Sequence, residues 1–163
     1  MSSNRRTPLP GSSGHRRPNI GILFRDLGQS LVRRVTDGLA EAGFDDVRPA
    51  HTVVFQHIDA DGSRLTDLAE RAQITKQSMG YLVDYLEERG YVERRPDPGD
   101  RRVALICLTD RGWAEIEAAL AIMAQVEDEW TRRLGKARMR ELRKALTELH
   151  ATATDHGSAS ETT

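Results

Sequence analysis

The residues whose types and spacing best suit chemistry lie in one segment, VERRPDPGDRRVALICLTDRG, residues 92–112. Four of its arginines fall within nine positions: Arg94, Arg95, Arg101 and Arg102. Guanidinium groups bind phosphates, and arginine is drawn to the narrow minor groove of A·T-rich DNA. Asp100 lies two residues before Arg102, where its carboxylate can hold that guanidinium in a bidentate pair. The pattern predicts that these five residues contact a polyanion outside the protein.

The turn between the two pairs of arginines is fixed by its own residues. Pro96, Pro98 and Gly99 restrict the backbone, and the flanking runs YVERR and VALICL are typical of β-strands. A β-hairpin with an arginine-rich tip is therefore predicted. Because its turn is rigid, little conformational entropy is lost when the tip binds a partner.

The segment before the hairpin has the spacing of a helix-turn-helix. A short helix is predicted over 66–72 with Thr66 as its N-cap, and a longer one is predicted from Thr75 or Lys76 to Gly90. The three residues QIT separate the two helices, which must therefore cross steeply. A hairpin that directly follows such a pair is a wing, so a winged domain is predicted here.

The second of these helices is polar at its start and acidic towards its end. Its apolar residues are predicted to face the core: Met79, Leu82, Val83 and Leu86. Gln, Ser and Tyr side chains hydrogen-bond base edges or phosphates, and a helix N-terminus carries partial positive charge. The predicted DNA contacts of this helix are Thr75, Lys76, Gln77, Ser78 and Tyr81. The alternative is an ordinary amphipathic helix with a solvated face.

Long amphipathic helices are predicted on both sides of the winged domain. Apolar residues recur at helical spacing from Ile20 to Leu39, again over 49–58, and in a helix that Thr109 caps and Gly135 breaks. A last helix carries Met139, Leu142, Leu146 and Leu149. These apolar stripes exceed what a small winged domain can cover, which predicts a two-fold homodimer. A helical bundle within one chain is the alternative.

Residues 65–112 resemble the MarR family of bacterial winged helix-turn-helix regulators. The resemblance is carried by LEERGYVERR before the wing, DPGDRR at its tip and LTDRG after it. It implies that Asp100 and Arg102 orient and insert a minor-groove arginine. It also implies that residues 75–78 and Tyr81 meet the major groove, and that the flanking helices dimerise the protein.

The resemblance further implies a ligand-responsive regulator, most often a repressor, that binds a near-palindromic operator in double-stranded DNA. The effector would be a small, often aromatic molecule held between the dimer helices and the winged domain. Candidate residues for that cleft are Phe24, His51, Phe55, His57 and Trp113. For each of them the alternative is an ordinary core or surface position.

The expected fold is mainly α with a small β-hairpin wing: a winged helix-turn-helix domain plus a helical dimerisation region. The expected order begins with a disordered basic N-terminal arm over 1–18 and an N-terminal dimerisation helix over 19–47. A DNA-binding domain over 48–108, C-terminal dimerisation helices over 109–151 and a disordered tail over 152–163 follow.

Composition narrows the function classes. The 163 residues carry a net charge of −1, so any positive charge for a polyanion must be local, and residues 71–102 hold seven basic and six acidic residues. No apolar run reaches the length of a membrane span and no signal peptide is visible, so a cytoplasmic protein is expected. Cys107, the single cysteine, is interpreted as a small hydrophobe.

No metal site or cofactor is predicted. The residues Asp59, Asp61, Ser63 and Glu70 echo a calcium loop, but Arg64 stands where that loop needs glycine. Two other function classes stay open. The arginine-rich hairpin could dock an acidic protein partner instead of DNA. Cys107 could serve a thiol peroxidase, although no histidine or charged group adjacent in sequence supports that chemistry.

Overall fold

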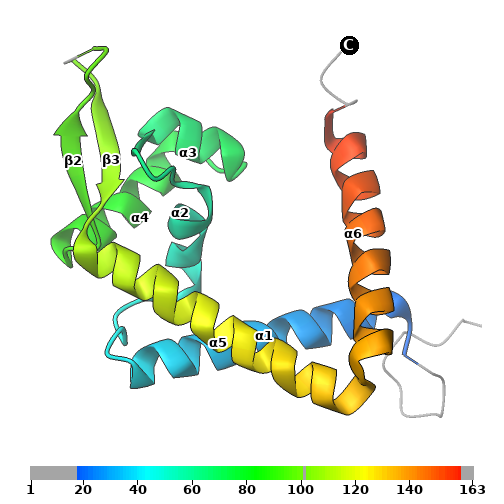
Figure 1. Cartoon of the computed structure of the whole chain (residues 1–163). Coiled ribbons are helices and arrows are strands. Elements are labelled where there is room, and N and C mark those ends of the chain that lie inside the picture. The colour runs from blue at the N-terminus through cyan, green and yellow to red at the C-terminus, as the bar shows by residue number, and fades with distance from the viewer. Residues whose placement is uncertain (1–17, 101, 159–163) are drawn as a thin grey trace, which may run out of the picture.

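The computed structural model describes residues 18–100 and 102–158, with side chains up to residue 152. Its first half contains α1 (Ile20–Glu41), the short 3-10 helix η1 (Pro49–His51), α2 (Thr52–His57), β1 (Ser63–Arg64), α3 (Leu65–Arg71) and α4 (Lys76–Glu88). Its second half contains β2 (Val92–Pro96), β3 (Ala104–Leu108), α5 (Asp110–Leu134) and α6 (Lys136–Ser158). The mainly helical fold with a small wing is confirmed (Figure 1).

Side-chain capping explains where two of the helices begin. The hydroxyl of Thr75 accepts a hydrogen bond from the backbone N–H of Ser78, 3.1 Å away, and Thr109 caps α5 in the same way at 3.2 Å. The cap predicted for α3 is wrong. Thr66 lies inside that helix, and its N-cap, Arg64, makes no side-chain capping bond.

The predicted hairpin is confirmed, and a third strand joins it. Strands β2 and β3 pair antiparallel from Val92 opposite Leu108 to Pro96 opposite Ala104. The two-residue strand β1 pairs with the other edge of β3, so the sheet order is β1-β3-β2. Because β1 is only Ser63 and Arg64, it has no alternating pattern that the sequence could reveal.

The core lies between this sheet and helices α2, α3 and α4. Its fully buried side chains include Val54, Leu68, Met79, Val83, Leu86, Tyr91 and Ile106. Met79, Val83 and Leu86 are three of the four residues predicted to form the inner face of α4, and Leu82 packs against the same cluster. Cys107 is also buried, as expected for a small hydrophobe.

The long helices α1 and α5 pack against each other beneath the winged domain, whereas α6 rises from the far end of α5 and stands apart from that domain (Figure 1). The two terminal guanidinium nitrogens of Arg34 on α1 donate hydrogen bonds to the carboxylate of Glu129 on α5, each at 2.8 Å. At the corner between α5 and α6, Gly135 has a φ of +84°, which glycine adopts without strain. Within the described residues, no helix is long and apolar enough to cross a membrane.

The structure bears differently on the two terminal segments that were predicted to be disordered. Residues 1–17, almost all of the predicted basic arm, lie outside the described residues. The tail predicted from residue 152 does not begin there, because α6 continues to Ser158.

Candidate nucleic-acid interface

The first turn of α4 presents polar side chains at the surface. Thr75 and Ser78 share a hydrogen bond between their hydroxyls at 2.8 Å, and the amide nitrogen of Gln77 donates to the hydroxyl of Tyr81 at 3.2 Å. Tyr81 is 66% exposed, and Lys76 is exposed with no ion pair among the described residues. All five residues predicted from the sequence therefore lie at the exposed start of this helix or one turn beyond it.

The acidic end of α4 is partly neutralised by the wing. Arg94 on β2 donates to Asp84 at 2.6 Å and also pairs with Glu87. Arg94 was predicted to contact DNA, but the structure pairs it within the chain. This pairing fastens the first wing strand to α4 and masks carboxylates that would otherwise repel phosphate.

The four predicted arginines of the wing thus differ in what they contact. Arg95 pairs with Glu93 on the same strand. The guanidinium of Arg102 has no partner among the described residues, and Arg101 lies outside them. The predicted side-chain pair between Asp100 and Arg102 is not formed: the Asp100 carboxylate accepts the backbone N–H of Arg102 at 3.0 Å. Asp100 therefore shapes the turn and leaves the guanidinium free.

An ion pair that sequence reasoning missed anchors the wing tip. Arg64 on β1 donates two nitrogens to Asp97, at 3.0 and 2.5 Å, and Asp97 also accepts the backbone N–H of Gly99 at 2.8 Å. The bond from Gly99, followed by the pairing with Arg64, lowers the pKa of the Asp97 carboxyl. The tip is therefore fixed by the short third strand as well as by its prolines.

Arg64→Ala is expected to loosen the wing tip without unfolding the domain. Asp97 would keep its bond to Gly99 but lose the contact with β1, so the amides of Asp97 and Val103 should exchange hydrogen about tenfold faster. Hydrogen exchange measured by NMR checks this. Arg95→Ala is the control, because its partner Glu93 lies on the same exposed strand; equal exchange in both variants would contradict the anchoring role.

A second polar network joins the end of α4 to the loop that follows α1. The backbone carbonyl of Asp46 accepts a hydrogen bond from the hydroxyl of Tyr85 at 2.8 Å. The carboxylate of Asp46 accepts one from the hydroxyl of Tyr91. Arg111 at the start of α5 donates to the same carboxylate at 3.2 Å and to the Tyr91 hydroxyl at 3.0 Å. Burial and the bond to Asp46 raise the pKa of Tyr91 to about 12. These contacts couple the loop rigidly to α4.

A cavity of about 370 Å³ lies beside that loop, between α1, α2 and α5. Its walls are mainly apolar and include Leu31, Val35, Leu39, Phe55, Ile116 and Met123. Two charged side chains also line it, Arg48 from the loop and Glu115 from α5. Volume and composition are those of a small-molecule site, for which about 300–1,000 Å³ is usual.

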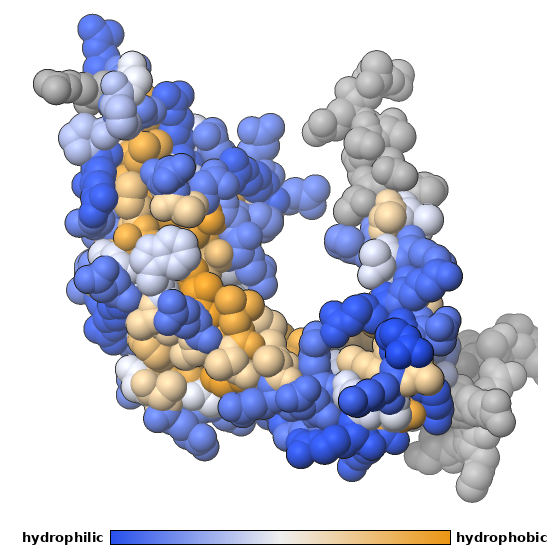
Figure 2. Space-filling model, in the orientation of Figure 1, coloured by the Kyte–Doolittle hydropathy of each residue, from blue (hydrophilic) through white to orange (hydrophobic). Residues whose placement is uncertain are grey.

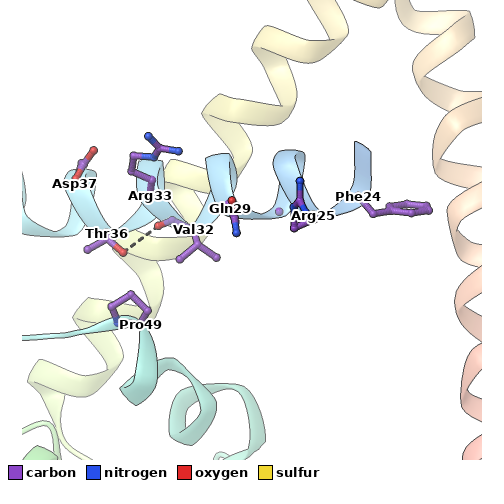
Figure 3. Close-up of a pocket in the computed structure, with 9 residues that line it drawn as sticks. Phe24, Arg25, Gln29, Val32, Arg33, Thr36, Asp37 and Pro49 are labelled. Atoms are coloured by element: carbon purple, nitrogen blue, oxygen red, sulfur yellow. Dashed lines mark hydrogen bonds between the residues drawn. The ribbon is translucent and has the colours of Figure 1, made fainter. Parts of the chain in front are cut away.

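The candidate ligand residues are not brought together. Phe55 lines the cavity, whereas Phe24 lines a shallow hollow along the exposed face of α1, shown in Figure 3. That hollow and the cavity share Val32, Thr36 and Pro49 in their walls. His57 and Trp113 line neither of them.

His51, the remaining candidate, is a core residue. Its ring stacks on Tyr85 at a centroid distance of 4.1 Å, and its Nδ1 accepts the backbone N–H of Arg48 at 3.1 Å. Burial, with the nearby charges of Arg48 and Arg89, lowers the pKa of His51. The neutral ring therefore serves as packing between the loop and α4.

Comparison with known proteins places the chain among transcriptional regulators. The sequence profile of the MarR family matches residues 45–103. The uncharacterized HTH-type transcriptional regulator YdcH of Bacillus subtilis (strain 168) is 30% identical over 109 residues, covering 66% of this chain and 74% of YdcH. The HTH-type transcriptional repressor MdtR of the same organism is 27% identical over 104 residues, covering 63% of this chain and 65% of MdtR.

A solved structure shares this fold. CouR from Rhodococcus jostii RHA1, bound to p-coumaroyl-CoA, superposes with a TM-score of 0.61 at 26% identity, over 80% of this chain and 91% of CouR. The profile match spans the helix-turn-helix and the wing up to its tip, which are the elements of the candidate interface. The chain is therefore a member of the MarR family of helix-turn-helix transcriptional regulators and not an enzyme.

Proposed function

We propose that the protein is a cytoplasmic, homodimeric repressor that binds a near-palindromic operator in double-stranded DNA. In this proposal the start of α4 enters the major groove and the wing tip reaches the adjacent minor groove. The observation that carries the proposal is the anchored wing, on which the guanidinium of Arg102 has no partner among the described residues. A tip held by Asp97 and Arg64 presents that charge without further ordering, and minor grooves attract arginine.

The homodimer is supported by apolar side chains that one chain leaves at its surface. On α1 and α6 these are Ile20, Leu23, Phe24, Leu27, Leu142, Leu146 and Leu149. Two copies related by a two-fold axis would bury this surface between them. Their two α4 helices would then lie about one DNA turn apart, roughly 34 Å. The near-palindromic operator follows from that symmetry.

Release by a small molecule is supported by the position of the cavity. Its wall includes Val47, Arg48 and Pro49, which belong to the loop that Asp46 bonds to α4. A ligand that shifts this loop would also shift α4, because Tyr85 is held by both Asp46 and His51. The structure of CouR bound to p-coumaroyl-CoA supports the binding of an organic molecule by this fold.

Arg102→Ala is the test of the proposed function. A dimer loses two minor-groove contacts, so operator affinity should fall by about 100-fold. The thermal midpoint should stay unchanged, since the Arg102 side chain has no partner among the described residues. Fluorescence anisotropy with the DNA upstream of the protein's own gene measures the affinity, at two salt concentrations.

Arg33→Ala is the matched control, because Arg33 is also exposed and unpaired in the described chain but lies on α1. Its operator affinity should change by no more than about threefold. Equal affinity of the wild type and Arg102→Ala for the operator would overturn the role of the wing. Absence of any sequence-specific DNA binding would favour the alternative, a wing that docks an acidic protein partner.

A further inference from the structure

Glu115 is a carboxyl group buried in an apolar place. Its residue is only 2% exposed, yet it makes no hydrogen bond and no ion pair with any described residue. It lies on the face of α5 that turns towards α1 and α2, one turn after Gly112 and one turn before Ala119. An unpaired carboxylate in such surroundings is costly unless something satisfies it.

The oxygens of Glu115 open into the cavity. In the described part of the chain, every fully enclosed side-chain nitrogen or oxygen has a hydrogen-bond partner. Because Glu115 has none, its oxygens are not fully enclosed, and the cavity whose wall it forms is the space they reach. The carboxyl group is therefore available to whatever occupies the cavity.

No charge of the described chain balances this carboxyl group. Burial alone raises its pKa to about 7, with no contribution from a neighbouring cation. Arg48, the other charged residue of the cavity wall, is itself exposed. The remaining polar side chains of the wall are uncharged: Thr36, Thr52 and Gln56. The cavity thus combines apolar walls with one unbalanced acidic group.

We propose that the effector of this regulator is a hydrophobic organic cation, an amine whose ammonium group pairs with Glu115 while its apolar body fills the cavity. This inference rests on the proposed function and names the ligand class for it. The ammonium group replaces the water lost by the carboxylate, so pairing recovers the cost of burying the acid. An organic anion would place a like charge against Glu115 and is disfavoured.

The approach to the cavity agrees with this class of ligand. Figure 2 shows apolar side chains gathered along α5 and the wing on the face in view. Leu120 of α5 is exposed and also forms part of the cavity wall. The outer hollow of Figure 3 adds Phe24 beside the shared wall residues Val32, Thr36 and Pro49. An aromatic body can therefore reach the cavity along an apolar surface.

Three naphthalene derivatives of similar size and different charge test the proposal: naphthylmethylamine, naphthylmethanol and naphthoate. Isothermal titration calorimetry at pH 8, with Glu115 mostly ionised, should show the amine binding at least about tenfold more tightly than the alcohol. Naphthoate should bind most weakly. Equal affinity for the amine and the alcohol, tighter binding of naphthoate, or no binding of any of the three would overturn the proposal.

Two variants assign the preference to one residue. Glu115→Gln keeps the shape but removes the charge, so the amine should lose about tenfold in affinity while the alcohol keeps its own. Glu117→Gln removes an exposed carboxylate two positions along α5 and should leave all three affinities unchanged. An unchanged affinity of Glu115→Gln for the amine would contradict the pairing.

The same protein preparations separate this proposal from the one on which it rests. Wild type and Glu115→Gln should bind the operator equally in the absence of ligand, and the amine should release only the wild type at low concentration. If operator binding is intact and the amine preference is absent, the ligand class alone is wrong. If the wild type ignores DNA, the proposed function fails, whatever the calorimetry shows.

Discussion

Replacing Gly112 with alanine should lower the free energy of unfolding by about 3 kcal/mol, one of the two largest effects we expect from a single change. A Cβ atom at this position would lie 2.2 Å from the carbonyl oxygen of Tyr91 and 2.9 Å from Cδ2 of Leu108. The first of these is a backbone atom that cannot rotate away. The start of α5 must therefore move from the sheet or the core must open.

The Tyr91 carbonyl accepts two hydrogen bonds from Thr109, which is why the clash cannot relax cheaply. The backbone N–H and the hydroxyl of Thr109 both donate to it at 3.1 Å. Movement of Tyr91 would also disturb its bond to Asp46 and hence the loop beside the cavity. Urea unfolding at one fixed protein concentration measures the loss, since the proposed homodimer would make stability depend on concentration.

Gly80→Ala is the matched control, because it makes the same change inside another helix of the domain. The new Cβ would meet nothing closer than 4.0 Å, the distance to Cδ2 of Leu65. Alanine favours the helix over glycine, so this variant should gain about 0.5–1 kcal/mol. Equal losses in the two variants would contradict the close packing of α5 on the sheet.

The wing and the helix-turn-helix could be predicted because local signals agreed. The caps Thr75 and Thr109, the turn prolines and the apolar run VALICL of the hairpin indicate the same boundaries. These features depend on residues close in sequence. The buried face of α4 was also predictable, since Met79, Val83 and Leu86 repeat at helical spacing.

The contacts that set the charge pattern could not be predicted, because they join residues far apart in sequence. Arg64 meets Asp97 across 33 positions, and Arg94 reaches back ten positions to Asp84. The sequence shows six acids among residues 71–102 but not which of them are neutralised. The structure reduces the wing to one free guanidinium among its described arginines, that of Arg102.

The residues that line the cavity were missed for a different reason, although the position of Glu115 in the sequence indicates that it is unusual. This acid falls on the apolar face of α5, between Gly112 and Ala119, where a helical wheel shows it out of place. The candidate ligand residues were chosen instead as aromatic and histidine side chains. Ring type does not reveal which side of a helix faces a cavity, and His51 packs into the core.

Glu115→Gln should change how stability depends on pH. The pKa of the Glu115 carboxyl rises from an ordinary 4.5 to about 7 on folding, so the folded state binds the proton more tightly than the unfolded state. The stability that the protonated group contributes is complete below pH 4.5 and is lost as the pH rises through about 7. The free energy of unfolding of the glutamine variant, measured relative to that of the wild type, should therefore rise by about 2–3 kcal/mol as the pH is raised from 5 to 8.

Urea unfolding at pH 5, 6, 7 and 8 measures this difference, with Glu117→Gln as the control on the same helix. The Glu117 side chain is exposed, so the stability of that variant should run parallel to the wild type at every pH. Arg48 is the other charged group of the cavity wall and is unchanged in both variants. If Glu115→Gln also ran parallel to the wild type, the carboxyl group would titrate as in water. The cavity would then hold no unbalanced acid, and its preference for a cation would lose its physical basis.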